Sequence, residues 1–209
     1  MKPAIALLIA VAFAFSSNLN AQADSGKASA FTGLFEEVQA GSLHLFSHFN
    51  EELPADFAFT GQKIGKKYYG FFSGEYRQML ESGAVFYAVY RMKNDGKDAY
   101  IIRMPSNKGP HTFYLFEWRG ETLHSVQLLA YAFCADGFCH QQDCWVADLN
   151  GDSKVDILTQ FRRTLPRSRK VLTSNEQVYL QKDAGRFGIV PQGAVHLESG
   201  RFELQELAY

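Results

Sequence analysis

Short apolar runs, rich in β-branched and aromatic side chains, alternate with polar segments from about residue 84 onwards. Runs of this length are typical of strands and are too short for most helices. The runs are AVFYAVYRM, AYIIRM, TFYLFEW, LHSVQLLAYAF, VDILTQF, EQVYL, RFGIV and RFEL. This pattern predicts a domain built mainly of short strands.

Dipeptides that end in glycine separate these runs. They are Asp95-Gly96, Arg119-Gly120, Asp136-Gly137, Asn150-Gly151, Ala184-Gly185 and Ser199-Gly200. Glycine supplies the positive φ that two-residue hairpin loops require. We therefore expect a predominantly antiparallel meander sheet, curved or partly closed. A sandwich, a barrel and a half-open sheet all fit the pattern.

Residues 31–53 have a different period, which fits a helix. Apolar side chains recur three or four positions apart, at Phe31, Leu34, Phe35, Val38, Leu45, Phe46, Phe49 and Leu53. Gly41 interrupts the pattern and Pro54 ends it, so one or two short helices are predicted. The expected fold class is α+β, mainly β, with this N-terminal helical segment packed on the sheet.

The first residues have the layout of a secretory signal peptide. Lys2 precedes an unbroken apolar run, Ala4–Phe15, and cleavage is expected after Ala21 or Ala23. The run is shorter than the roughly 20 residues of a spanning helix, and no second long run follows, so we expect no membrane span. The first cysteine is Cys134, so no cysteine near the cleavage point could carry a lipid anchor. A periplasmic or secreted protein is predicted.

Composition limits the domain organisation and the partners. Residues 22–30 are small and polar and are expected to form a disordered linker before a single domain, residues 31–209. The 21 Lys and Arg residues are balanced by 22 Asp and Glu residues. A nearly neutral chain lacks the field that attracts nucleic acid or anionic membranes over long distances, so we expect neither partner.

The segment WVADLNGDSKVDIL, residues 145–158, gathers oxygen-bearing side chains at alternate positions. The candidate ligands are Asp148, Asn150, Asp152, the main-chain carbonyl of Lys154, and Asp156. Ca²⁺ takes six to eight oxygen ligands, and loops of this kind supply them from alternate positions. No Cys or His lies in the segment, which argues against zinc. We predict a calcium loop, with a plain polar hairpin turn as the alternative.

DLNGDSKVDIL resembles the DxNGDGxxDL calcium loop of FG-GAP and VCBS repeats, which occur in secreted and surface β-propeller proteins. The resemblance covers about a dozen residues and implies that calcium braces the structure or an adhesion surface. Ser153 stands where the family usually has glycine, at a position that implies a positive φ and reduced affinity. The motif occurs once, so the resemblance implies the loop and not the propeller.

Three cysteines lie in CADGFCHQQDC. A hairpin turn at Asp136-Gly137 would place Cys134 opposite Cys139, at a separation that a disulfide accepts. The alternative pairing is Cys134 with Cys144. An odd cysteine remains, either buried and free or available for a crosslink between chains.

A basic run, RRTLPRSRK, occupies residues 162–170. We expect a solvated loop there, with contact to an anionic glycan or a protein partner as the alternative. That contact would use Arg162, Arg163, Arg167, Arg169 and Lys170.

Taken together, these features predict a non-enzymatic extracytoplasmic binding or structural module with one structural Ca²⁺ loop. The alternative is a secreted hydrolase whose site assembles from distant strands, for example from Asp143, Glu117 and His124. A third possibility is a subunit crosslinked through the odd cysteine.

Overall fold

The structure, a computed structural model, describes residues 26–39, 41, 43–94, 96–182, 186–191, 193–197 and 202–207. The expected signal peptide, residues 1–21, and its cleavage sites lie outside these residues. The chain divides into two compact units, residues 1–34 and 35–209. The unit that holds the sheet therefore begins at residue 35, where we had expected a domain from residue 31.

Residues 26–32, in the first unit, form a helix. Residues 26–30, part of the linker expected to be disordered, thus have a helical backbone. Their sequence, GKASA, contains alanine and lysine, which favour helices, and Gly33 follows at a position where helices often end. The packing of an N-terminal helix on the sheet stays a prediction.

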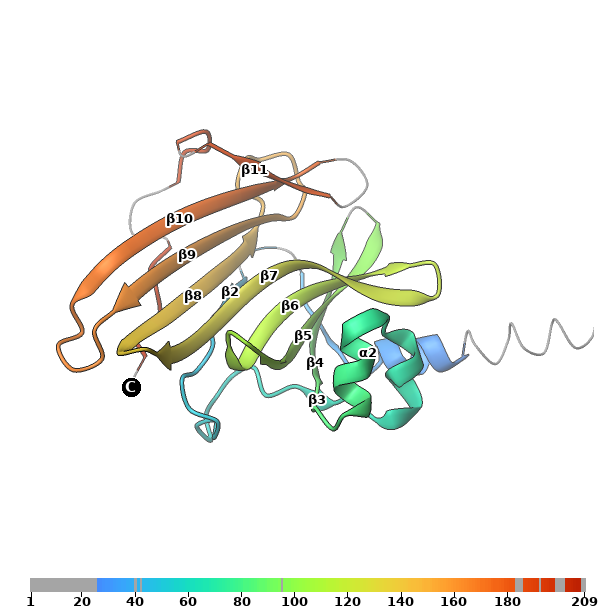
Figure 1. Ribbon diagram of the computed structural model, residues 1–209. Helices are drawn as coiled ribbons and strands as arrows, with labels where there is room; N and C mark the ends of the chain where they lie inside the picture. The colour runs from blue at the N-terminus through green and yellow to red at the C-terminus, as the bar shows by residue number, and fades with distance from the viewer. Residues whose placement is uncertain are drawn as a thin grey trace, which may run out of the picture. The chain divides into compact units, whose positions relative to one another are not determined.

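Eleven strands of the described residues form one mainly antiparallel sheet (Figure 1). Strands β4 to β11 follow one another across it in chain order, which confirms the meander. The two strands at the ends of this order, β1 and β11, do not pair with each other in the described residues, so the sheet is open. The strands are β1 (Glu36–Glu37), β2 (Leu43–Leu45), β3 (Gln62–Lys63), β4 (Tyr87–Asn94), β5 (Lys97–Ser106), β6 (Gly109–Arg119), β7 (Thr122–Ala135), β8 (Phe138–Ala147), β9 (Asp156–Thr164), β10 (Val171–Gln181) and β11 (Phe187–Val190).

Glycine-containing turns join several of these strands, as predicted. Gly96, Gly120 and Gly137 have φ values of 74°, 64° and 78° and lie in the β4–β5, β6–β7 and β7–β8 connections. Asp136 also adopts a positive φ, 52°, which suits a two-residue hairpin. The dipeptides Ala184-Gly185 and Ser199-Gly200 lie outside the described residues.

The main apolar core covers one face of the sheet. It contains Ile101, Leu115 and Leu129 from β5, β6 and β7, together with Phe57 and Phe59 from the segment before β3. Side chains alternate between the two faces of a strand. Every second residue of the central strands therefore points into this core.

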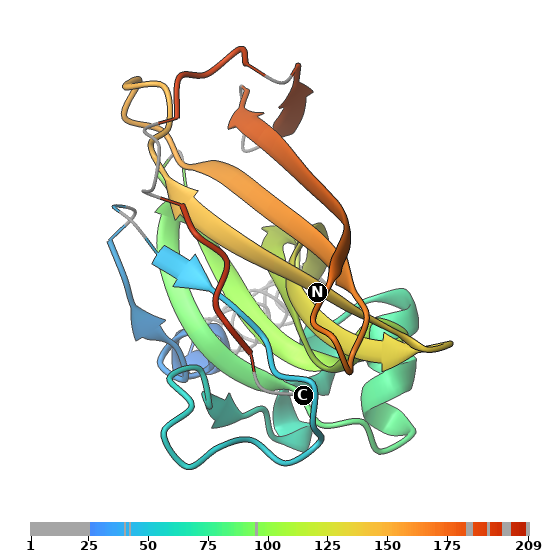
Figure 2. The same cartoon turned by 90° about the vertical axis from the view of Figure 1, so that its left-hand side faces the viewer.

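A second, smaller core lies on the opposite face of β8, β9 and β10, around Trp145, Leu158 and Val178. Residues near the C-terminus cover it, and the ring of Phe202 lies 5.8 Å from that of Trp145. Figure 2 shows this C-terminal segment, in dark red, passing beside β2. The run RFEL, residues 201–204, is therefore not a strand in its described part, because its apolar side chains pack on a sheet face instead.

The helix predicted for residues 31–53 is wrong beyond residue 32. The chain instead forms β1, which pairs with β4, and β2, which pairs with β8. Leu43 and Leu45 both join the main core, while His44 between them stacks on Trp145 at a centroid distance of 4.3 Å. This alternation is the period of a strand. It is hidden among the neighbouring apolar residues, which fit a helix equally well.

Further helical structure occurs after β3, in residues for which no element was predicted. A 3₁₀ helix, η1 (Lys66–Phe71), precedes α2 (Gly74–Glu81). Phe72, between them, packs its ring against Phe116 of β6 at 5.8 Å, and Tyr76 of α2 lies 5.1 Å from the same ring. These helices therefore cover the face of β6 opposite the main core, to which the adjacent Leu115 belongs.

Candidate functional site

The predicted calcium loop connects β8 to β9. Asp148 follows the last residue of β8, and Asp156 is the first residue of β9, where it pairs with Ala147. Two adjacent strands thus hold the ends of the loop in fixed register. The first and last candidate ligands therefore sit on the most rigid part of the segment.

Side-chain oxygens organise the loop by accepting its own backbone N–H groups. Asp148 accepts from Gly151 at 2.7 Å through Oδ1 and from Ser153 at 2.8 Å through Oδ2. Asn150 Oδ1 accepts from Asp152 at 3.0 Å. Ser153 has a φ of 64°, which confirms the positive φ predicted where the family has glycine.

Three carboxylates converge in this loop. One oxygen each from Asp148, Asp152 and Asp156 can be chosen so that all three lie within 4.8 Å of one another. Asp152 is exposed, Asp148 is half-buried and Asp156 is fully buried. Burial raises the pKa of the Asp156 carboxyl, and the nearby Asp152 and Asp148 raise it further, against the backbone N–H groups that lower it.

Asp156 also connects the loop to the rest of the sheet. Its Oδ2 accepts the N–H of Leu149 at 3.0 Å, and its Oδ1 accepts the N–H of Gln181 at 2.9 Å. The side-chain Oε1 of Gln181 in turn accepts the N–H of Val155 at 3.1 Å. The end of β10 is therefore hydrogen-bonded to the loop between β8 and β9.

The donor set of this loop fits a hard cation. It offers carboxylate and amide oxygens, with Asp148, Asp152 and Asp156 supplying negative charge, and the backbone bonds leave lone pairs available on each carboxylate. Asn150 and the Lys154 carbonyl stay predicted ligands. The alternative of a plain hairpin turn explains the bonds to Asp148. It gives no reason for three carboxylates to converge.

The cysteine pairing that local geometry favoured is confirmed. Cys134 and Cys139 form a disulfide and occupy opposed positions on β7 and β8. Cys144 is a free, fully buried thiol, and burial raises its pKa well above the usual range. A crosslink through Cys144 would require this thiol to leave the core.

The basic run spans the end of β9 and the connection to β10. Arg162 donates to Gln141 Oε1 at 3.1 Å and to the carbonyl of Gln205 at 3.0 Å, and Arg163 lies over the ring of Phe138 at 3.7 Å. Arg162 therefore links β9 to β8 and to the C-terminal segment, and Arg163 packs on β8.

Arg167, Arg169 and Lys170 are exposed in the connection. A pocket of about 210 Å³ includes Arg162 and Arg169 in its lining, but also Glu206, whose charge weakens attraction for an anion. The predicted anion contact stays a prediction.

The residues considered for a hydrolase are only partly brought together. Glu117 and His124 face each other across β6 and β7. The His124 nitrogens, however, lie within hydrogen-bond distance of the hydroxyls of Ser73, at 3.4 Å, and Thr122, at 3.0 Å. Asp143 is fully buried on β8.

Asp143 pairs with a histidine that the sequence did not associate with it. Its Oδ2 lies 3.0 Å from Nε2 of His44 and accepts the N–H of Gln205 at 2.7 Å, while its Oδ1 accepts from Gln141 at 2.7 Å. The pair thus joins β2, β8 and the C-terminal segment. His44 and Asp143 are 99 positions apart, and only the β2–β8 pairing reveals their contact.

Within the described residues, no helix has both the length and the apolar character needed to cross a membrane. Comparisons with protein-family models, with curated proteins and with solved structures gave no match to this chain.

Proposed function

We propose that this chain is an extracytoplasmic binding module braced by one calcium ion in the loop between β8 and β9. The observation that carries the proposal is the convergence of Asp148, Asp152 and Asp156, with an oxygen from each within 4.8 Å of the others. Three carboxylates this close repel one another unless a cation offsets their charge. The exclusively oxygen donor set favours Ca²⁺.

The ion would act on the stability of the sheet. Asp148 and Asp156 lie at the facing ends of β8 and β9, and Asp156 bonds to the backbone of Gln181 at the end of β10. Calcium bound to the folded form alone would add about 2.7 kcal/mol at a hundredfold excess over Kd. For a domain of this size, that corresponds to a melting midpoint about 5–10 °C higher.

An extracytoplasmic location is part of the same proposal. The Cys134–Cys139 disulfide supports it, because disulfides persist in oxidising compartments. Millimolar calcium outside the cytoplasm would also suit a loop of modest affinity. A hydrolase has weaker support, because Asp143 and His124 are engaged in hydrogen bonds that position strands and the C-terminal segment.

The test is thermal unfolding of the mature chain in calcium and in a chelator, for wild type and Asp152→Asn. Calcium should raise the wild-type midpoint by several degrees and leave the variant nearly unchanged. In the chelator, the variant should be at least as stable as wild type, because removing one charge relieves the repulsion. Asp56→Asn, which changes an exposed aspartate outside the loop, should respond to calcium like wild type. A wild-type midpoint indifferent to calcium would refute the proposal.

A second variant tests the backbone of the loop. Ser153→Gly removes the cost of a side chain at φ 64°, which is roughly 1–2 kcal/mol for a non-glycine residue in this region. Because the described fold already has this φ, the variant should raise the melting midpoint in the chelator as well as in calcium. A lower midpoint in both conditions would contradict the assigned loop geometry.

A further inference from the structure

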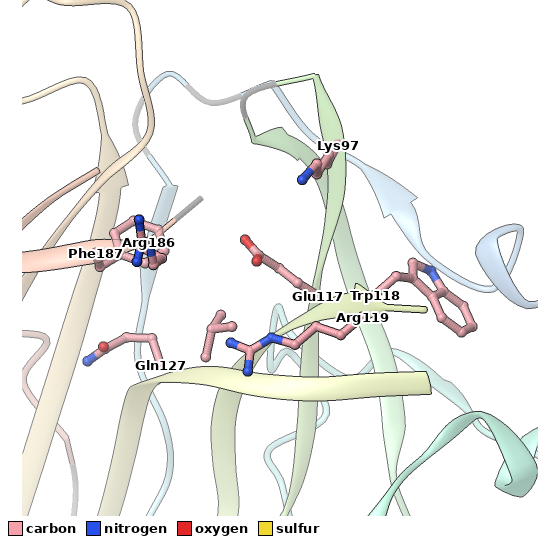
Figure 3. A pocket seen from close by; sticks show the side chains of 8 residues that line it. Lys97, Glu117, Trp118, Arg119, Gln127, Arg186 and Phe187 are labelled. Carbon is pink, nitrogen blue, oxygen red and sulfur yellow. The ribbon is translucent and has the colours of Figure 1, made fainter. Parts of the chain in front are cut away.

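A pocket of about 520 Å³ lies over one end of the sheet, and none of its lining residues is assigned above to calcium (Figure 3). It is formed by β5, β6 and β7 together with residues at the start of β11. Its volume is within the usual range of about 300–1,000 Å³ for small-molecule sites. The lining residues are Lys97, Glu117, Trp118, Arg119, Val126, Gln127, Arg186 and Phe187.

Strand alternation decides which of these side chains face the pocket. Glu117 and Arg119 project into it from β6, whereas the ring of Trp118 points away (Figure 3). Trp118 packs instead against Phe71 of η1, with ring centroids 5.1 Å apart. The chemistry of the pocket therefore comes from its polar side chains and from the ring of Phe187.

The charges of the pocket favour an anion. Lys97, Arg119 and Arg186 are all exposed and outnumber the single carboxylate among the lining residues, Glu117. Arginine binds carboxylate and sulfate oxygens through two parallel N–H bonds. A focused positive charge in a nearly neutral protein would act locally and not as a general field.

The remaining groups favour a ligand rich in hydroxyls. The Glu117 carboxylate, towards which the Lys97 amino group points, has oxygens that accept from hydroxyl donors (Figure 3). Gln127 offers both a donor and an acceptor from β7, and Val126 and Phe187 contribute apolar surface. A neutral sugar would make no use of the Arg119 and Arg186 charges.

We infer that this pocket binds an acidic saccharide, a sugar chain that carries carboxylate or sulfate groups. Arg119 and Arg186 would hold the acidic group, Glu117 and Gln127 the hydroxyls, and Phe187 the face of a ring. The inference names the ligand of the binding module proposed above and rests on that proposal. It does not depend on calcium.

The experiment is calorimetric titration of the mature chain with three probes: a galacturonic acid trisaccharide, a sulfated heparin-derived tetrasaccharide, and neutral maltotriose. At least one acidic probe should bind and maltotriose should not. Binding of the galacturonic acid trisaccharide would show that carboxylates suffice, whereas binding of the heparin fragment alone would show that sulfate is required, because heparin also carries carboxylates. Arg119→Gln and Arg186→Gln should each weaken binding about tenfold or more, because each loses charge-assisted hydrogen bonds. Arg77→Gln, an exposed arginine on α2, is the matched control and should bind like wild type.

Each titration is repeated in calcium and in a chelator, and the melting midpoint of every variant is recorded. If the chain binds an acidic probe but its melting midpoint is the same in calcium and in the chelator, only the calcium loop would be overturned. Calcium-dependent stability without saccharide binding would overturn only the pocket assignment. Equal binding of maltotriose, or folded Arg119→Gln and Arg186→Gln variants with wild-type affinity, would also overturn the pocket assignment.

Discussion

Replacing Arg103 by methionine should strongly destabilise the fold. Arg103 is 3 % exposed and lies on β5, with its guanidinium 4.0 Å from the Tyr87 ring centroid. It donates to the carbonyls of Phe59 at 3.1 Å and Thr60 at 2.6 Å, and it lies 2.8 Å from Nδ1 of His111. One buried cation thus joins the segment before β3 to the centre of the sheet.

The magnitude follows from the groups that would lose their partner. Thr60 is exposed, so its carbonyl can turn to water. The Phe59 carbonyl and His111 Nδ1 are buried, and an unsatisfied buried group costs about 1–3 kcal/mol. Methionine restores part of the apolar contact but none of the hydrogen bonds. We expect a net loss of about 3 kcal/mol, or a melting midpoint roughly 6–12 °C lower.

Urea unfolding followed by tryptophan fluorescence measures this loss directly. Arg77→Met is the matched control, because Arg77 is exposed and pairs with Glu81 at the surface of α2. That control should change the free energy of unfolding by less than about 0.5 kcal/mol. If Arg103→Met stays within about 1 kcal/mol of wild type, the buried hydrogen bonds contribute far less than the geometry implies.

Three further predictions concern pH and the cysteines. Burial lowers the pKa of His111 in the folded state below its ordinary value of about 6.5. The free energy of unfolding should therefore be highest above pH 6.5 and should fall as the pH drops through the lowered pKa of the folded state. His111→Gln should flatten this pH dependence in urea titrations. Cys144 should not react with Ellman's reagent at pH 8 in the native state and should give one thiol per chain in urea, whereas three thiols would disprove the disulfide. Replacing Cys134 and Cys139 by serine should lower the free energy of unfolding by about 2 kcal/mol, because the closed loop is short. An unchanged urea midpoint would contradict that estimate.

Features encoded within a few neighbouring residues were predictable from the sequence. Apolar runs and glycine turns predicted the meander of β4 to β11, and the Asp136-Gly137 turn predicted the Cys134–Cys139 pairing. The proposed calcium loop belongs to the same class. Its candidate ligands lie within nine residues, and the pairing of the neighbouring strands β8 and β9 brings Asp148 and Asp156 together.

Features that depend on distant partners were not predictable. The spacing predicted a helix through residues 36–37 and 43–45, yet these form β1 and β2, because β4 and β8 offer strand edges to pair with. Residues 74–81 carry only three apolar side chains at helical spacing, Tyr76, Met79 and Leu80, which is too short a repeat to predict a helix by itself, and α2 forms where Tyr76 can pack on Phe116. Tertiary packing supplies most of the stability of short elements and therefore overrides weak local preference.

The two candidate sites also differ in how far they could be predicted, because one is local in sequence and the other depends on distant partners. The proposed calcium loop is a local motif, whereas the pocket joins Lys97, Arg119 and Arg186 from three separate strands or connections. No spacing along the chain relates these residues, because β-sheet pairing sets their proximity. The sequence by itself determined the strand pattern, the disulfide and the position of the acidic loop. Only the tertiary structure decided which distant charges meet, because side chains far apart in sequence become neighbours when strands pair and cores close.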